Sequence, residues 1–360
     1  MTTLELPSVR DEAWRWADLK ALRAAAETEP RPTGIDPEDL FLDLDGPRLC
    51  FVDGAFEPAH SLPGRVTVSR LALGSTHPLG ALTEGEGWAI DLPAEAAVTN
   101  IQIVHLGSGG ESHLPARIVL AEDAVASLVE TYAGVGWANR LTRISLGRGA
   151  RLMRSVRLLQ AEGFVSLRDE AEVGEAASLV TMVLGAGAMS SRVDGAVTIT
   201  GKGGFAEMGG ALLTSGAQKQ EAAVSVRHEQ VEGTSRQLWR AVAKDESAAS
   251  VAARVEVARG AQQTDGEQSL RGLLLNRGAI VNLKPELEIF ADDVKCAHGA
   301  AVGELDAMAL FYLASRGIDE ARAKALMTHA FVGDALARIG EEAVREAFAA
   351  DADRWLEMAL

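Results

Sequence analysis

Short segments in which hydrophobic and polar residues alternate recur through the middle of the chain. They occur between about residue 97 and residue 291, with examples at 101–103, 197–199, 224–226 and 255–257. Side chains of a strand point alternately to its two faces, so a period of two residues indicates strands with one buried face. This region is therefore predicted to be built almost entirely from short β-strands.

Corners rich in glycine and alanine separate these segments, at 147–150, 185–188, 259–261 and 277–279. A coil of roughly 18 to 25 residues, sometimes doubled between visible corners, accounts for their uneven spacing. Short strands joined in this way, with almost no helix between them, favour a parallel β-helix in which each coil buries its face on the next. An antiparallel sandwich is the alternative, but it is expected to show more hairpin signals than the few Asp-Gly pairs present here.

The period changes to a helical one after Gly303. Apolar residues at i, i+3, i+4 and i+7 extend from Leu305 to Leu313, and the same spacing recurs after Asp319 and again after Glu342. This spacing places the apolar residues on one face of a helix. We therefore expect a tail of three helices with buried apolar faces.

The amino-terminal part is less regular. Residues 11–27 are rich in helix formers and begin with acidic residues, which predicts one helix, docked by its tryptophans and leucines. Residues 29–93 contain most of the prolines and are expected to form irregular strand and loop. The chain thus divides into an N-terminal helical and irregular region (1–96), a β-helix core (97–300) and a C-terminal helical domain (301–360).

The candidate chemistry lies where the strands end. Residues 285–291 alternate as a half-buried strand does, and Cys296 and His298 follow the Asp292-Asp293 pair. If the backbone stays extended, Cys296 and His298 project to the same face. A sulfur and an imidazole suit iron or zinc, but structural metal centres usually need four ligands. The remaining ligands must then come from elsewhere in the fold, from a partner or from sulfide.

Two other interpretations of this pair stay open. In the first, Cys296 is a small buried thiol beside a hydrogen-bonded His298, because free cysteine is mostly buried. In the second, Cys296 is a nucleophile and His298 its base, although no third orienting group is evident in the sequence.

The sequence around this pair resembles the SufD family. The similar segments are KPELEI at 284–289, ADDVKCAHGA at 291–300, LFYL at 310–313 and RGI at 316–318, with a weaker similarity at 6–19. SufD proteins are subunits of the scaffold that assembles iron-sulfur clusters in the SUF system. The KPELE run and the Cys-x-His pair are typical of SufD rather than of its sister subunit SufB.

The resemblance implies a mainly β fold, a right-handed parallel β-helix with helical regions at both ends. It implies pairing with a SufB-like subunit through β-helix edges, with a homodimer as an open alternative when the chain is alone. It also implies a SufC-like ATPase bound to the helical tail, for which Phe311, Tyr312 and Arg316 are the expected contacts unless Tyr312 belongs to the core. Cys296 or His298 would ligate a nascent iron-sulfur cluster at the subunit interface. No catalysis by this chain and no cofactor on the isolated chain are expected.

Composition narrows the classes of partner. The formal net charge of −16 disfavours nucleic acid and anionic membranes, which attract clustered positive charge. No apolar run approaches the roughly 18 residues of a spanning helix, and the start of the sequence has no signal-peptide pattern. Two cysteines, Cys50 and Cys296, are too few for a disulfide framework. These features predict a cytoplasmic protein. Cys50 lies between Leu49 and Phe51 and is expected to pack in the core or at an edge.

The other motifs carry weaker signals. The glycine-rich pieces at 107–110 and 200–205 lack the spacing of a phosphate-binding loop and are expected at corners. His228 is expected to be a structural histidine, and the polar side chains of 261–268 are expected either to stack along the coils or to line a subunit contact. Because β-helices are common in polysaccharide-cleaving enzymes, a carbohydrate-active enzyme is the alternative function.

Overall fold

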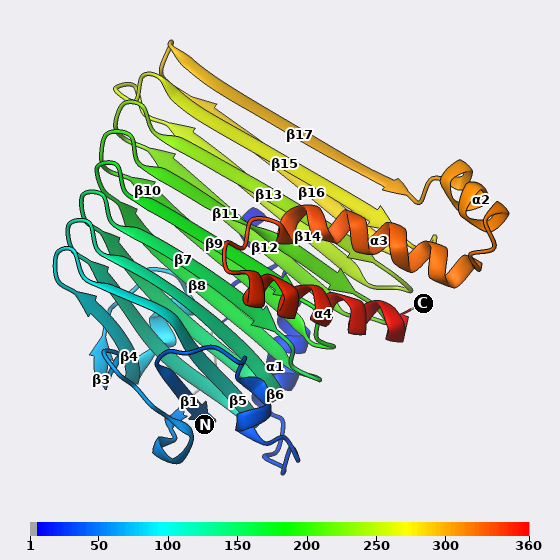
Figure 1. Cartoon of the computed structure of the whole chain (residues 1–360), viewed down its shortest axis with the longest axis horizontal. Coiled ribbons are helices and arrows are strands. Elements are labelled where there is room, and N and C mark those ends of the chain that lie inside the picture. The colour runs from blue at the N-terminus through cyan, green and yellow to red at the C-terminus, as the bar shows by residue number, and fades with distance from the viewer. Residues whose placement is uncertain (1–5, 360) are drawn as a thin grey trace.

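The computed structural model describes residues 6–359, and it shows a mainly β protein with helices near both ends. Parallel strands stack along one axis as a flattened β-helix (Figure 1), which confirms the predicted fold class. The stack begins with the two long strands β5 (Ala97–Leu120) and β6 (Val125–Leu146), which pair with each other and bend through both faces of the helix.

From β6 onward the strands alternate between two faces. The first face continues with β8 (Phe164–Val173), β10 (Ser190–Ile199), β12 (Lys219–His228), β14 (Ala248–Val257) and β16 (Ile280–Ile289). The second face continues with β7 (Arg151–Leu158), β9 (Ser178–Gly185), β11 (Phe205–Thr214), β13 (Thr234–Ala243), β15 (Thr264–Leu274) and β17 (Val294–Glu304).

The coils are longer than the sequence suggested. Asn139 pairs with Ser166, 27 residues further along the chain, and Ser250 pairs with Asn282, 32 residues further along. The predicted coil of roughly 18 to 25 residues is therefore wrong. Each coil holds two strands and two corners, and some corners lack the glycine-alanine pattern, such as EQVEG at 229–233. Because such corners have no recognisable sequence pattern, the coil length cannot be measured from the spacing of the corners in the sequence.

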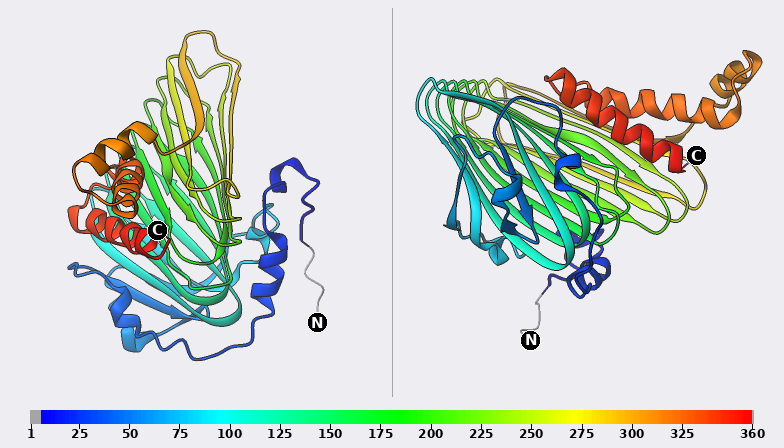
Figure 2. Two further views of the ribbon diagram at one scale, coloured as in Figure 1. Left: turned by 90° about the vertical axis from the view of Figure 1, so that its right-hand side faces the viewer. Right: turned by 60° about the horizontal axis from the view of Figure 1, so that its bottom comes forward.

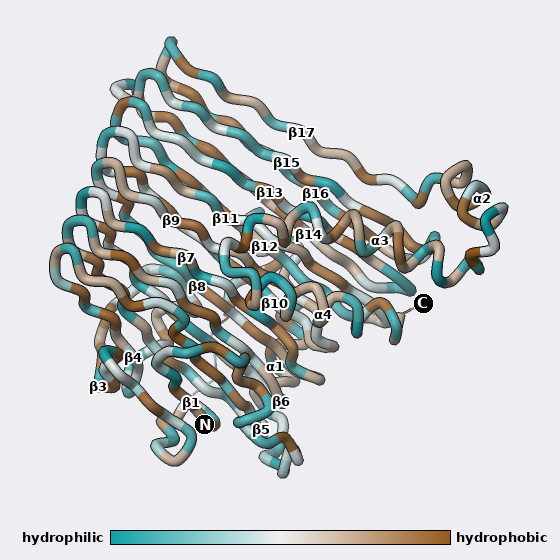
Figure 3. The backbone as a smooth tube through the Cα atoms, viewed as in Figure 1, coloured by the Kyte–Doolittle hydropathy of each residue, from teal (hydrophilic) through white to brown (hydrophobic). Residues whose placement is uncertain are grey.

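The core lies between the two faces and follows from the alternation of side chains. In β13, burial alternates along the first half of the strand, and hydropathy alternates in the same way along the stacked strands (Figure 3). Inward apolar residues of successive coils then form one continuous core that includes Ile144, Val173 and Ile199. Gly149 has a φ of 66°, in the left-handed region that favours glycine, at the corner between β6 and β7.

The amino-terminal end of the stack is closed. Strands β1 (Arg48–Val52) and β4 (Glu84–Leu92) pair in parallel with β5, while the short strands β2 (Ala55–Phe56) and β3 (Thr67–Ala72) pair antiparallel with β1 and β4. The turns η2 (Pro37–Leu40), η3 (Pro58–His60) and η4 (Gly80–Leu82) connect these elements. Trp88 on β4 is fully buried in the main core, so this layer seals the first coils.

The predicted helix at 11–27 is interrupted. It forms a single turn η1 (Glu12–Trp14) and then α1 (Leu19–Ala26), which lie beside the stack (Figure 2). Asp18 begins α1 because its side chain accepts a hydrogen bond from the Ala21 amide, and its backbone is not helical. Trp14 and Leu22 are buried, as expected.

Three helices follow the last strand, as predicted: α2 (Ala307–Ser315), α3 (Glu320–Leu336) and α4 (Glu342–Ala359). Helices α3 and α4 cover the outer side of the second face (Figure 1), and Phe348 and Trp355 are buried in the cluster between α4 and the strands. A buried ion pair anchors α4, with Arg157 Nε 2.7 Å from Asp351 Oδ2. None of the helices in residues 6–359 is both long enough and apolar enough to cross a bilayer.

Helix α2 departs from the prediction of a buried apolar face. It has no buried residue, and Met308, Phe311 and Tyr312 are 76%, 71% and 56% exposed. The helix extends away from the carboxy-terminal end of the stack (Figure 1). It contacts α3, and Leu310 and Leu313 are half-buried, but nothing in the described part of the chain covers Met308, Phe311 and Tyr312. The periodicity correctly indicated a helix with apolar side chains, but it could not indicate whether this chain supplies the surface that covers them.

Candidate functional site

Cys296 and His298 lie on the last strand of the stack. Strand β17 pairs in parallel with β15, with Cys296 opposite Gly266 and His298 opposite Gln268. Within residues 6–359, β15 is the strand that pairs with β17, and β14 is the one that pairs with β16. Both strands therefore leave a free edge at the carboxy-terminal end of the stack (Figure 1), where the next coil would otherwise begin.

The two side chains share a face, as the spacing predicts, and this face is the inner one. Along β15 the buried residues are Thr264, Gly266, Gln268 and Leu270, so their partners on β17 also face the interior of the β-helix. No further coil covers that interior here. Cys296 is half-buried and His298 is exposed, so both side chains lie at the uncovered carboxy-terminal end of the β-helix interior, between β16 and β17. We call this opening the mouth.

The thiol of Cys296 is partly embedded in apolar residues. It packs beside a small cluster that includes Val255 and Ala291, and a Cβ at Gly266 would lie 3.4 Å from its Sγ. Burial raises the pKa of Cys296, Asp265 raises it further, and a backbone hydrogen bond from Gly266 opposes the rise. The thiol is therefore protonated at neutral pH, which favours neither nucleophilic attack nor metal binding until a cation displaces the proton.

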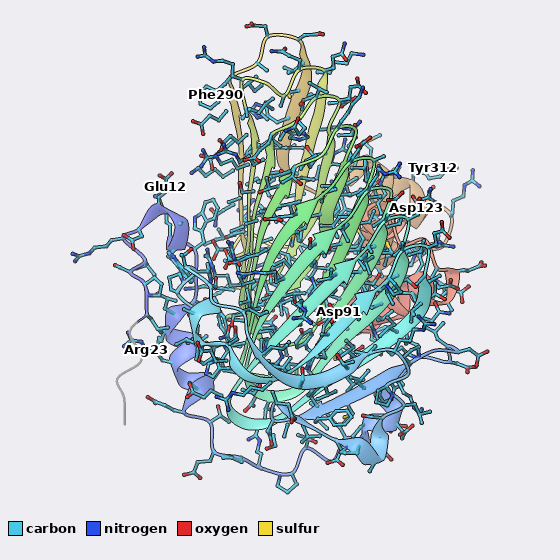
Figure 4. All side chains as sticks on the ribbon, turned by 90° about the vertical axis from the view of Figure 1, so that its left-hand side faces the viewer. Glu12, Arg23, Asp91, Asp123, Phe290 and Tyr312 are labelled. Carbon is cyan, nitrogen blue, oxygen red and sulfur yellow. The ribbon has the colours of Figure 1, made fainter. Side chains whose placement is uncertain are left out.

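The pair is an incomplete metal site. Within the described residues, no group of three or more His, Cys, Asp and Glu side chains is placed to hold a metal ion. An open groove of about 460 Å³ lies beside the mouth, lined by β16, β17 and Trp16 of the amino-terminal segment. Phe290, 53% exposed, projects at the far end of the same edge (Figure 4). The arrangement can contribute two donors to a site that another molecule completes.

The three residues expected to contact an ATPase lie together on the exposed end of α2. Phe311 and Tyr312 are exposed, and the Arg316 guanidinium lies 5.0 Å from the centre of the Tyr312 ring. The alternative that Tyr312 belongs to the core is wrong, because its side chain projects from the outer surface (Figure 4). The structure thus places an aromatic and cationic patch on α2, separate from the mouth.

The other candidates have structural roles. Cys50 is fully buried, and its pKa is raised to about 12 by burial and by Glu57 and Glu38, so it is a core thiol as predicted. His228 is also fully buried, with its Nε2 2.8 Å from Ser235 Oγ. Burial lowers the pKa of His228 to about 4, which keeps the ring neutral.

Sequence reasoning missed a cluster of charged side chains inside the first coils. Arg154 donates to Glu130 Oε1 at 2.6 Å and to Asp169 Oδ2 at 2.5 Å, and Tyr132 donates to Glu130 Oε2 at 2.8 Å. Burial raises the pKa of Glu130, but the charge and hydrogen bond of Arg154 and the interaction with His105 together outweigh burial and hold this pKa at about 2. The available signal was the presence of charges at inward positions of otherwise apolar strands.

Comparison with known proteins agrees with this picture. Residues 99–331 match the family described as SUF system FeS cluster assembly, SufBD core domain. The chain is 26% identical over 380 residues to the iron-sulfur cluster assembly protein SufD of Escherichia coli, covering 95% of this chain and 87% of that protein. It is 25% identical over 396 residues to an iron-sulfur cluster assembly SufBD family protein of Synechocystis, covering 94% of this chain and 84% of that protein.

A shorter match of higher identity links the chain to the protein ABCI7, chloroplastic, of Arabidopsis thaliana. The two are 41% identical over 115 residues, which cover 32% of this chain and 24% of that protein. The family model spans β5 to β17 and includes α2, so it covers the mouth and most of the stack. The resemblance to SufD noted in the sequence is confirmed, and it displaces the alternative of a carbohydrate-active enzyme. The chain belongs to the SufBD family of the SUF iron-sulfur cluster assembly system.

Proposed function

We propose that this chain is a SufD-like scaffold subunit whose open mouth is half of a cluster-assembly site. The observation that carries the proposal is that Cys296 and His298 lie on a strand with a free edge and have no third ligand among the described residues. A SufB-like subunit would add its strands to β16 and β17 and supply the remaining ligands. The nascent iron-sulfur cluster is cargo in this scheme and has no resident site on the isolated chain.

The edge itself supports a strand-pairing partner. Strand β17 is 11 residues long and mostly exposed, and Val302 and Ile289 contribute exposed apolar side chains on the two edge strands. Proteins usually shorten, charge or cover such an edge, because unpaired amide and carbonyl groups recruit other strands. An edge left long and apolar suits addition of strands from another subunit. A second copy of this chain could pair in the same way when no SufB-like subunit is present.

The donor set suits temporary ligation of iron. A thiolate and an imidazole both bind iron, and a cluster held by few ligands from each subunit is easier to release than one held by four from a single chain. Because the pKa of Cys296 is raised by burial, iron binding at this thiol would release a proton. In this proposal the chain holds ligands in place and catalyses no reaction of its own.

Helix α2 supports a second partner. Its exposed aromatic side chains and Arg316 belong to the residue types that anchor protein interfaces. We assign this patch to a SufC-like ATPase, whose movements would be transmitted through the segment 305–306 that joins α2 to β17. ATP hydrolysis would then change the geometry of the mouth without any nucleotide binding to this chain.

The test is the His298→Ala variant, produced together with SufB-like and SufC-like subunits under anaerobic conditions. We expect the complex to assemble while its bound iron and sulfide fall about tenfold or more, by analogy with the loss of a metal-site residue. His329→Ala is the matched control, because His329 is another exposed histidine and lies on α3 beside Asp353. Unchanged iron and sulfide in the His298 variant would contradict the proposal.

A further inference from the structure

A buried glutamine lies directly beneath His298. Gln268 is 1% exposed on the inner side of β15, and it is the residue opposite His298 in the pairing with β17. Neighbouring strands are about 4.8 Å apart, and paired residues of parallel strands share a face. The Gln268 side chain therefore lies in the β-helix interior, one strand further inward than the His298 side chain.

The orientation of this carboxamide is fixed from below. Gln268 Nε2 donates to Gln237 Oε1 at 2.8 Å and to the Glu286 carbonyl oxygen at 3.3 Å. The amide nitrogen of Gln237 is already used, because it donates to the Arg254 carbonyl oxygen at 3.1 Å. A flipped Gln268 would bring its own oxygen against two acceptors, so Oε1 must occupy the remaining direction.

The oxygen held in this way lacks a partner. Gln268 Oε1 is buried and accepts no hydrogen bond from the described residues, although such groups are normally satisfied. Within residues 6–359, His298 likewise forms no side-chain hydrogen bond or ion pair, and its side chain is exposed. A residue with an acceptor that lacks a donor is thus paired across the two strands with a residue whose ring carries an N–H donor.

We propose that Gln268 is a positioning residue for His298, accepting a hydrogen bond from one ring nitrogen. In neutral imidazole the other nitrogen then carries the lone pair and faces the open mouth. Metal-binding histidines commonly have such a partner, which fixes the tautomer and the ring orientation. The hydrogen bond itself concerns this chain alone, while its use in holding iron rests on the proposed function.

The test compares the tautomers of His298 in wild type and in the Gln268→Met variant. The isolated chain is labelled at its histidine nitrogens, and the His298 signals are assigned by their loss in His298→Ala. Because one hydrogen bond is at stake, we expect the ratio of the two neutral tautomers to differ about fivefold between wild type and Gln268→Met. Thr264→Val is the control, since it removes a buried hydroxyl from the same face of β15 opposite Val294.

Identical tautomer ratios in wild type, Gln268→Met and Thr264→Val would overturn the assignment. If Gln268→Met does not fold, the double variant Gln237→Met/Gln268→Met replaces both partners of a buried hydrogen bond, which is better tolerated than removing one, and the same ratio is measured. A fivefold change with normal iron and sulfide in His298→Ala complexes would support the hydrogen bond and reject the proposed function. Unchanged tautomer ratios together with a loss of iron and sulfide in His298→Ala complexes would support the proposed function and reject the role of Gln268.

Discussion

The two ends of the β-helix differ in whether their inward polar side chains have partners within the chain. At the amino-terminal end, β1 to β4 close the stack, and Arg154 forms ion pairs with Glu130 and Asp169 inside the first coils. At the carboxy-terminal end, the edges of β16 and β17 are free, and His298 and Gln268 Oε1 have no bonded partner among the described residues.

This difference indicates that the same kind of coil stabilises the fold at one end and offers a binding surface at the other. Both ends place polar side chains at inward positions of paired strands. At the first end the charged groups form ion pairs with one another, whereas at the second end His298 and Gln268 Oε1 have no bonded partner among the described residues. Ion pairs buried at the closed end make the fold sensitive to the loss of either partner, whereas groups left without partners at an open end are available to another molecule. The comparison predicts that substitutions at the first end change stability, and that substitutions at the second end change assembly.

The largest expected effect is that of Arg154→Met. This substitution removes the cation from the buried cluster and leaves Glu130 and Asp169 as unpaired buried carboxylates. Breaking a buried ion pair in this way costs about 3–5 kcal/mol. The free energy of unfolding, measured by urea denaturation, should fall by that amount.

The control is Arg227→Met, the same substitution at an arginine whose side chain is 47% exposed and paired with Glu229 and Glu256. Exposed pairs of this kind contribute at most about 1 kcal/mol. If the two variants lost equal stability, the view of the first coils as a self-sufficient ionic cluster would be wrong.

An intermediate effect is expected from pH acting on the closed end. His105 lies between Phe51 and Tyr132, and burial, assisted by Arg140, lowers its pKa to about 4. In the unfolded chain a histidine has a pKa near 6.5. The unfolded state therefore binds more protons between these values, so stability is full above pH 6.5 and falls as the pH is lowered toward 4.

The variant His105→Phe, which preserves the aromatic stack, should lose less stability than wild type between pH 8 and pH 5. The difference is expected to be about 2 kcal/mol, measured by denaturation at both pH values. Burial raises the pKa of Glu221 to about 7, which acts in the opposite direction, but this group is present in both proteins and cancels. Parallel stability curves for the two proteins would contradict the assigned protonation.

The same contrast explains which features could be predicted from sequence. Alternation identified the strands, and the caps and apolar spacing of α3 and α4 identified those helices, because these signals depend on neighbouring residues. The Cys-x-His spacing placed Cys296 and His298 on one face for the same reason. The polar run at 261–268 was expected to stack or to line a contact, and Gln268 does stack on Gln237.

Features that depend on distant parts of the chain were not predicted. Glu130, Arg154 and Asp169 come from three strands, and their meeting depends on a coil length that the corners do not reveal. The exposure of α2 could not be predicted either, because an apolar face packs equally well on the same chain or on another. Sequence periodicity indicates that a face is to be covered, and the three-dimensional structure indicates what covers it.

The smallest effect on the isolated chain is expected at the free edge. Val302 is 45% exposed on β17 and lines the groove beside the mouth. The variant Val302→Lys adds a charge that remains in solvent, so the free energy of unfolding should change by less than about 0.5 kcal/mol. Val156→Lys is the matched control, since Val156 is fully buried on β7 and an unpaired buried cation there should prevent folding.

Assembly should respond to the same Val302→Lys substitution in the opposite way. Lysine on an edge strand opposes the addition of further strands, because pairing would remove its ammonium group from water. Copurification with a SufB-like subunit should therefore be weakened although the variant itself melts like wild type. Full recovery of the complex would mean that the partner does not pair with β17, and the free edge would then need a different occupant.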